Sequence, residues 1–315
     1  MKIIFFGTPL FSVPILESLD KSEHNILAVV TQPDKRQGRK KTLVPSPVKE
    51  YAMQHNIPVF QPDKVNEKTF IKQIKEYKPD VMVLVAFGQF IGKTLLELAP
   101  WGILNVHFSL LPRHRGASPL ANAILQGDIE TGVTIMQLVK QMDAGPILAQ
   151  KSIPIQKTDT RATLEEKTAP LGAELLLDVL QGLPNGKYIP QKQEECQATY
   201  CYTFNKKDGI MNWNQDAIFL ERFIRAMNPW PMAQTTLQNN NKQESILIWE
   251  ATAHDVKTNA TPGTIIKLDK TTLEIATKQG SLQIQKLQKA GKNVMSIAEF
   301  LCGANMQPDA FFLSS

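Results

Sequence analysis

The sequence of 315 residues contains little cysteine. Its three cysteines, Cys196, Cys201 and Cys302, are scattered and form no CxxC pair, which excludes a disulfide framework, so we expect free thiols. No group of histidine, cysteine and carboxylate residues has the spacing of metal ligands, so we predict no metal. No apolar run approaches the roughly 20 residues that span a bilayer, so we predict no contact with a membrane.

Two amino-terminal motifs are also missing. The first apolar run ends at Gly7-Thr-Pro9, before it reaches the about 7–15 apolar residues of a secretory signal. We therefore expect a first strand and a cytoplasmic protein. The turn that follows has one glycine and not the GxGxxG of a dinucleotide site, which disfavours binding of a nicotinamide or flavin.

The length of the chain is about twice that of a typical domain, so we expect two domains. A composition of 43% hydrophobic and 21% charged residues is that of an ordinary globular protein. Between the two domains the sequence becomes polar and loses its periodicity. We place a first domain at 1–189, a linker at 190–208 and a second domain at 209–315.

Apolar runs without strict alternation predict strands that are buried on both faces of a mostly parallel sheet in the first domain. The strands are expected at Lys2–Phe6, Ile26–Val30, Val81–Val85, Gly102–Val106 and Val133–Val139. Helices are expected between and after them, from Gly7–Pro9 to about Ser22 and at Pro47–Asn56, Asn66–Tyr77, Gly92–Leu98, Ala117–Gln126 and Thr160–Leu180. The resulting fold class is α/β.

The second domain is predicted to be a small β-barrel after an initial helix, Asp216–Met227. Short strands are expected at Ser245–Glu250, Gly263–Leu268, Leu273–Ala276 and Leu282–Leu287. For Trp230 and Trp249, packing in the core is favoured over stacking on nucleic-acid bases.

The predicted strand Gly102–Val106 leads to two polar side chains, Asn105 and His107, before Pro112. Residues i and i+2 of a strand project to the same side, so an amide and an imidazole are expected to face one space. An amide N–H can stabilise the oxyanion of a tetrahedral intermediate. An imidazole can donate or accept a proton near neutral pH. The pair suits acyl chemistry, although a lone histidine near a strand end is more often structural.

A carboxylate, Asp143, follows the strand Val133–Val139. Functional groups in open α/β sheets gather in the loops after strands, where a carboxylate could orient the imidazole of His107. The alternative is a structural one, because an aspartate before Ala-Gly-Pro also favours a turn.

The loop from Asp34 to Lys49 is strongly basic. A run of this kind is usually only solvated, but its position after the second strand, on the side expected to hold Asn105 and His107, favours contact with phosphate groups. The chain as a whole carries a net charge of only +5, so any nucleic-acid surface must be local. In the second domain, Lys286, Lys289 and Lys292 are the candidates for such a patch, with a solvated role as the alternative.

The segment Asn105-Val-His107-Phe-Ser109-Leu-Leu-Pro112, together with Asp143-Ala-Gly-Pro, resembles the formyltransferase family that uses 10-formyltetrahydrofolate. The resemblance runs from Ile3–Pro9 to Ala290–Lys292 and so covers nearly the whole chain. It is strongest to those members that formylate the amino group of initiator methionyl-tRNA for translation initiation.

The resemblance implies a Rossmann-like catalytic domain, a linker and a C-terminal OB-like domain that binds tRNA. It implies Asn105, His107 and Asp143 as catalytic residues, 10-formyltetrahydrofolate as cosubstrate and no metal. The folate-binding residues that it implies are Ser109, Leu110, Leu111, Pro112, Gln89 and Ile91. The tRNA-binding residues that it implies are Arg36, Arg39, Lys40, Lys41, Lys206 and Lys207. We expect a monomer. Phe108 stands where many relatives have glycine, so its side chain must either point away from the pocket or narrow it.

Three alternative functions remain at this point. The acceptor could be a sugar amine or glycinamide ribonucleotide, although the basic loop and the second domain favour tRNA. Water could replace the amine, which would make the chain a formyltetrahydrofolate hydrolase that releases formate. The chain could also be an RNA-binding protein without activity, although the presence of all three polar residues argues against this.

Overall fold

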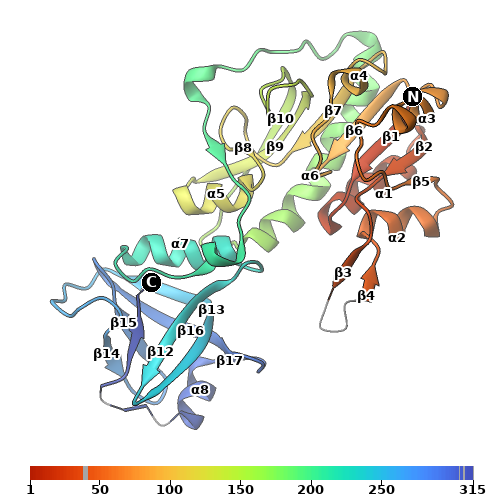
Figure 1. Ribbon diagram of the computed structural model, residues 1–315. Helices are drawn as coiled ribbons and strands as arrows, with labels where there is room; N and C mark the ends of the chain where they lie inside the picture. The colour runs from red at the N-terminus through yellow and green to blue at the C-terminus, as the bar shows by residue number, and fades with distance from the viewer. Residues whose placement is uncertain (38–41, 305, 308, 315) are drawn as a thin grey trace. The chain divides into compact units, whose positions relative to one another are not determined.

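The computed structural model describes residues 1–37, 42–304, 306, 307 and 309–314 (Figure 1). The chain divides into two compact units. The first consists of Met1–Pro119, Glu130–Pro154 and Glu165–Cys201, and the second of Leu120–Ile129, Ile155–Leu164 and Tyr202–Ser315. Residues 190–201 thus cluster with the first unit. The domain bounds 1–189, 190–208 and 209–315 stay a prediction.

The first unit is built on a seven-stranded sheet among the described residues, in the order β10-β9-β7-β6-β1-β2-β5. Its strands are β1 (Lys2–Gly7), β2 (Asn25–Val30), β5 (Val59–Phe60), β6 (Val81–Val85), β7 (Ile103–His107), β9 (Glu130–Gln137) and β10 (Ile147–Pro154). Strands β5, β2, β1, β6 and β7 are parallel, and β9 and β10 are added antiparallel to their neighbours. This confirms the predicted Rossmann-like, mostly parallel sheet.

Strand β10 was not predicted because it lies at the sheet edge and is largely half-buried or exposed. An edge strand with lysine and serine in its middle lacks the continuous apolar run of a central strand.

Helices cover both faces of the sheet (Figure 1). The helices α1 (Val13–Asp20), α2 (Pro47–Gln54) and α6 (Arg161–Gly182) pack on one face. The helices α3 (Lys68–Glu76) and α4 (Lys93–Leu96) pack on the other, where their apolar residues join one core cluster with Ile4, Phe6 and Ile103.

The alternation along β7 divides its side chains between these two faces. Val106 points toward α6, where its methyl group lies 3.1 Å from the position that a Cβ on Gly172 would occupy. Ile103 joins the core cluster of α3 and α4 on the opposite face. Asn105 and His107 have the same parity as Ile103 and therefore project to the α3 and α4 side.

The bulky residue after His107 points away from that side. Phe108 is buried and packs edge-to-face on Phe11, with ring centroids 5.0 Å apart. Phe108 therefore does not occupy the side to which Asn105 and His107 project.

The second unit is a nearly closed antiparallel barrel, with the path β14-β15-β16-β13-β12-β18 and β17 paired to β16. Its strands are β12 (Ala233–Asn239), β13 (Lys242–His254), β14 (Ile265–Leu268), β15 (Leu273–Ala276), β16 (Ser281–Lys289), β17 (Val294–Ser296) and β18 (Phe311–Leu313). A bridge between Thr264 and Phe311 links the two ends of the path. The predicted small OB-like barrel is confirmed.

Helix α7 (Ala217–Met227) packs on β13, and α8 (Ile297–Gly303) packs on β16. The remaining elements are η1 (Leu10–Ser12), β3 (Lys35–Gln37), β4 (Thr42–Val44), β8 (Arg115–Gly116), α5 (Pro119–Gln126), η2 (Leu183–Asn185), η3 (Glu195–Gln197), β11 (Tyr200–Cys201) and η4 (Lys206–Gly209).

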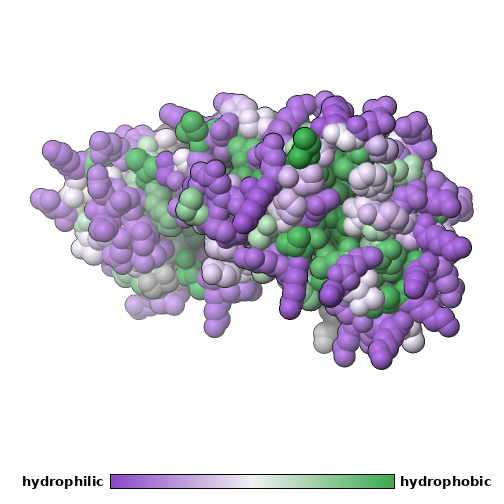
Figure 2. Space-filling model, turned by 90° about the horizontal axis from the view of Figure 1, so that it is seen from above, coloured by the Kyte–Doolittle hydropathy of each residue, from purple (hydrophilic) through white to green (hydrophobic). Residues whose placement is uncertain are grey.

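The surface is mixed in polarity. Figure 2 shows hydrophilic residues over much of the visible face, with hydrophobic residues in groups between them. Among the described residues, no helix has both the length and the apolar character needed to cross a membrane.

The tryptophan at the centre of the barrel core is Trp213, which is fully buried and donates from Nε1 to the Thr235 hydroxyl over 3.0 Å. Trp230 is 48% exposed, so the prediction that it packs in the core is wrong. Trp249 is half-buried and donates to Gln288. The immediate sequence neighbours do not reveal which tryptophan is buried, because the fully buried Trp213 lies between two asparagines.

We predict that Trp213→Ala lowers the free energy of unfolding of the barrel by about 3–5 kcal/mol, because the substitution empties a large core volume. The exposed Trp230 provides the matched control, and Trp230→Ala should cost less than about 1 kcal/mol. Urea unfolding followed by far-UV circular dichroism measures both. Equal losses for the two variants would contradict the placement of Trp213 at the centre of the core.

Candidate active site

The structure brings together the three side chains that were predicted to be catalytic. Asn105 and His107, at the end of β7, are both 6% exposed. The Nδ2 atom of Asn105 lies 3.5 Å from Oδ1 of Asp143. The Nδ1 atom of His107 lies 3.7 Å from Oδ2 of the same carboxylate. An amide, an imidazole and a carboxylate therefore converge on one space within the first unit.

The connection between β9 and β10 holds Asp143 in a left-handed backbone conformation, with φ at 46°. Its Oδ2 accepts a hydrogen bond of 2.7 Å from the backbone N–H of Gly116. Two residues on, the turn passes so close to β9 that a Cβ on Gly145 would lie 1.7 Å from the Gln137 carbonyl oxygen. Only glycine fits there. The turn is tight, and it fixes the direction of the carboxylate.

Backbone contacts orient the imidazole of His107 from its other side. The Nε2 atom lies 2.9 Å from the carbonyl oxygen of His114, so Nε2–H donates to that carbonyl. The Nδ1 atom then faces Asp143, and a second proton on Nδ1 would give an ion pair with the carboxylate.

The loop after β7 is held by a hydrogen bond within it and by another from β9. The Ser109 hydroxyl donates to the Arg113 carbonyl oxygen over 2.7 Å, and the Thr134 hydroxyl donates to the Ser109 carbonyl oxygen over 2.6 Å. The Leu111–Pro112 peptide bond is cis. Of the predicted folate-binding residues, Ser109 and Leu111 are thus buried parts of a well-tied loop, and Leu110 lies beside Gly132 on β9.

Two further predicted folate-binding residues follow β6. Gln89 accepts a hydrogen bond from the Val65 N–H over 2.8 Å and donates to the Pro62 carbonyl oxygen over 3.1 Å, so its side chain ties two loops together. Ile91 is buried in the same core cluster as Leu95 and Ile103.

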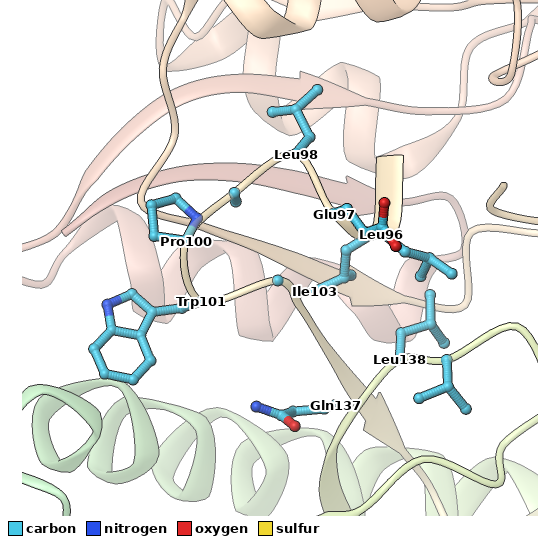
Figure 3. A pocket seen from close by; sticks show the side chains of 11 residues that line it. Leu96, Glu97, Leu98, Pro100, Trp101, Ile103, Gln137 and Leu138 are labelled. Carbon is cyan, nitrogen blue, oxygen red and sulfur yellow. The ribbon is translucent and has the colours of Figure 1, made fainter. Parts of the chain in front are cut away.

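A cavity of about 560 Å³ lies where β7 begins and β9 ends, at the other end of β7 from His107 (Figure 3). Its walls are Leu96–Ile103 and Gln137–Val139. Ile103 lies two residues before Asn105 on β7, and Gln137–Val139 lead into the turn that carries Asp143. The sequence did not reveal these walls, although their position beside the two predicted strands was an available signal.

The predicted tRNA-binding loop contains a short hairpin formed by β3 and β4 (Figure 1). Arg36 is exposed on β3, whereas Arg39, Lys40 and Lys41 lie outside the described residues. Lys49, also counted in the basic run, forms an ion pair of 2.8 Å with Asp34 at the base of the hairpin. Lys49 therefore supports the hairpin rather than adding to its exposed charge.

In the second unit, Lys206 and Lys207 are exposed on η4. Lys286 forms an ion pair with Glu250 at 2.6 Å, and Lys289 one with Glu244 at 2.7 Å. The last two lysines are partly neutralised, which favours the solvated alternative for that patch.

Comparison with known proteins identifies the family. The formyl transferase model matches residues 1–180, and the model of the formyl transferase C-terminal domain matches residues 204–305. The chain therefore belongs to the formyl transferase family. It is 45% identical over 303 residues to the methionyl-tRNA formyltransferase of Enterococcus faecalis, which is 96% of each chain. It is 40% identical over 307 residues to the methionyl-tRNA formyltransferase of Legionella pneumophila, covering 98% of this chain and 96% of that one.

Solved structures share the fold at lower identity. WlaRD, a sugar 3N-formyl transferase, superposes with a TM-score of 0.64 at 20% identity, over 93% of this chain and 99% of that one. HypX from Aquifex aeolicus, in complex with tetrahydrofolic acid, superposes with a TM-score of 0.60 at 18% identity, over 98% of this chain. This chain spans 48% of the length of HypX.

The buried thiol of Cys201 lies on β11, which pairs through Cys201 with Gly116, the residue that binds Asp143. Its Sγ donates to the Arg115 carbonyl oxygen over 3.2 Å. Burial raises the pKa of the Cys201 thiol to about 11; a backbone hydrogen bond from Ser118 opposes this shift, and the negative charge of Asp143 adds to it. Cys196 and Cys302 are exposed.

We predict that a thiol reagent at about pH 8 modifies Cys196 and Cys302 rapidly and Cys201 slowly. A pKa of about 11 leaves roughly one Cys201 thiol in a thousand ionised at that pH, and burial hinders access further. Because the thiolate is the reactive form, labelling of Cys201 should accelerate as the pH rises toward 10. Mass spectrometry of timed samples measures each site. Equally fast labelling of all three cysteines would contradict the packed environment of Cys201.

Proposed function

We propose that this chain transfers a formyl group from 10-formyltetrahydrofolate to the α-amino group of initiator methionyl-tRNA, and that Asn105, His107 and Asp143 carry out the reaction. The observation that carries the proposal is the convergence of these three side chains at the end of β7. The relatives at 40–45% identity support the choice of acceptor, since they are methionyl-tRNA formyltransferases.

The chemistry explains why three such groups are needed. An α-amine has a reference pKa of about 7.7–8.0, so near neutral pH much of it carries an extra proton that must leave before attack. Attack of nitrogen on the formyl carbon then forms a C–N bond and places negative charge on the formyl oxygen. When the intermediate collapses, the bond from carbon to the folate nitrogen breaks and that nitrogen takes up a proton.

Asn105 and His107 stabilise the negative charge on the formyl oxygen in this proposal. The Asn105 amide has two N–H donors, and its contact of 3.5 Å with Asp143 is long, so one donor is available for the formyl oxygen. His107 stands two residues further along the same face. A protonated imidazole there adds positive charge beside the oxygen, and it is kept in place by the Asp143 carboxylate and the His114 carbonyl oxygen.

Asp143 accepts the proton of the attacking amine in this proposal. Oδ2 is occupied by the Gly116 N–H, which fixes the carboxylate while leaving it able to accept a proton from the attacking amine, directly or through a water. A carboxylate that also faces His107 can hold the imidazole in its productive orientation at the same time.

We assign the folate to the space beside the end of β7, between the loop Ser109–Pro112 and the loop after β6 that carries Gln89 and Ile91. The tied loop Ser109–Pro112 borders the formyl end, and Gln89 supports the opposite wall.

The tRNA phosphates are assigned to Arg36, Lys206 and Lys207, which are exposed, and, from the sequence alone, to Arg39, Lys40 and Lys41. Contacts of this kind position a nucleic acid without reading its sequence. Because the proposed acceptor is an aminoacylated tRNA, we expect the enzyme to act in the cytoplasm. We expect it to act as a monomer.

We predict that Asn105→Ala lowers kcat for formylation about 10²–10³-fold, because one donor to the oxyanion is lost. The assay mixes charged initiator tRNA with 10-formyltetrahydrofolate and quantifies N-formylmethionine, with Asn185→Ala as an exposed asparagine control. Binding of tRNA should stay unchanged. A small loss would show that Asn105 is structural, and release of formate without formylated tRNA would overturn the proposed acceptor.

We predict that Arg36→Ser reduces the slope of log Kd for tRNA against log salt concentration by about one, because one phosphate contact is lost. Lys72→Ser, on the exposed part of α3, is the control for removal of a cation outside the predicted set. Fluorescence titrations at several salt concentrations measure the slope. An unchanged slope for Arg36→Ser would remove this residue from the RNA surface.

A further inference from the structure

Gln193 is a polar residue buried in a polar segment. It lies between the two family matches, which cover residues 1–180 and 204–305. Its side chain is only 5% exposed, although Gln191, Lys192 and Glu194 around it are exposed. A buried amide must find partners for its donors and its acceptor.

The partners of the Gln193 amide lie in the Asp143 turn. Nε2 donates to the Asp143 carbonyl oxygen over 2.8 Å and to the Gly145 carbonyl oxygen over 2.7 Å. A weaker contact of 3.9 Å reaches the sulfur of Met136. Both N–H groups of one side chain thus bind two carbonyls of the turn that carries the proposed proton acceptor.

The oxygen end of the Gln193 amide is held by the buried guanidinium of Arg115. Oε1 of Gln193 accepts a hydrogen bond of 3.0 Å from Nε of Arg115, whose side chain is fully buried. The two terminal nitrogens of Arg115 each donate to a different carboxylate oxygen of Glu195 over 3.0 Å. A bidentate pair of this kind fixes the plane of the guanidinium, and therefore the direction of the amide.

The backbone around Arg115 is tied to the same segment. The Arg115 N–H donates to the Thr199 carbonyl oxygen, and the His114 N–H donates to the Thr199 hydroxyl, both over 2.8 Å. His114 is the residue whose carbonyl oxygen holds His107. The segment from Gln191 to Cys201 therefore contacts the supports of both His107 and Asp143.

We propose that Gln193 is a positioning residue for Asp143, an inference that rests on the proposed function. The carboxylate lies 3.5 Å from Asn105 and 3.7 Å from His107, and its place depends on a left-handed turn that needs support from outside. Gln193 supplies that support through the backbone of the turn, without touching the substrates. Since a misplacement of about 1 Å can cost about 10²-fold in rate, its removal acts on the chemical step.

The first experiment compares three variants by steady-state kinetics. We expect Gln193→Ala to lower kcat about 10–100-fold while the KM values for tRNA and folate change little. Gln193→Glu keeps the volume but loses both donors to the turn, and should lose a similar factor. Gln191→Ala, the exposed glutamine two residues away, should match the unsubstituted chain. Retained kcat in Gln193→Ala, or full activity in Gln193→Glu, would overturn the proposal.

A double-mutant cycle distinguishes positioning from a general structural role. If Gln193 acts through Asp143, Gln193→Ala should change the residual rate of Asp143→Asn by less than about twofold. A further drop of about 10-fold or more in the Asp143→Asn background would show that Gln193 acts elsewhere.

A measurement that does not depend on enzymatic activity tests this inference separately from the proposed function. Cys201 donates to the carbonyl oxygens of His114 and Arg115, next to the anchor of Gln193. Gln193→Ala should accelerate thiol labelling of Cys201 about 10-fold or more in the folded protein, and Gln191→Ala should not. An inactive unsubstituted chain with this labelling difference would overturn the function alone. Equal labelling rates would overturn the support that Gln193 gives to the turn.

Discussion

The backbone N–H of Gly116 and the carboxylate of Asp143 lie 2.7 Å apart, and the arrangement of the site depends on this hydrogen bond. It joins the loop that follows β7 to the loop that follows β9. Gly116 has a φ of 114°, and a Cβ there would lie 2.1 Å from the Cys201 carbonyl oxygen, so the close approach requires glycine. The bond aims the carboxylate at the end of β7, where Asn105 and His107 project.

The sheet makes this meeting possible because of the order of its strands. Strand β7 lies between β6, which is parallel to it, and β9, which is antiparallel. Residues Asn105 and His107 pair with Met136 and Thr134, so β9 runs back past the site, and its loop with Asp143 returns on the same face.

The sequence predicts part of this arrangement for clear physical reasons. Residues i and i+2 of a strand project to the same face of any sheet, so the shared face of Asn105 and His107 is predictable. Continuous apolar runs predict strands that are buried on both faces. Asp143 could be placed after a strand, but its distance from His107 depends on the turn. The role of Gln193 could not be predicted, because its segment has no periodicity and its partners are backbone carbonyls. The walls of the cavity could not be predicted for the same reason, because turns without periodicity form much of them.

In the barrel, too, the sequence predicts some features and not others. The four predicted strands correspond to β13, β14, β15 and β16, whereas β12, β17 and β18 were not predicted. Strand β12 (Ala233–Asn239) gave a weak signal because it alternates buried and half-buried residues with threonine and glutamine. Trp213, between two asparagines, is buried, whereas Trp230, between two prolines, is exposed, so the sequence neighbours do not predict which of the two lies in the core. Local patterns fix the type of an element, and tertiary contacts decide which of its side chains are buried.

The most direct test of the central claim is a crystal structure of this chain with a formyl-bearing folate analogue that cannot transfer its group. The account predicts the formyl oxygen within about 3 Å of Nδ2 of Asn105. It also predicts that the Asp143 carboxylate still accepts the hydrogen bond of the Gly116 N–H, and that the ring lies between the loop Ser109–Pro112 and the loop that carries Gln89 and Ile91. A formyl group bound out of reach of Asn105, His107 and Asp143 would contradict the account.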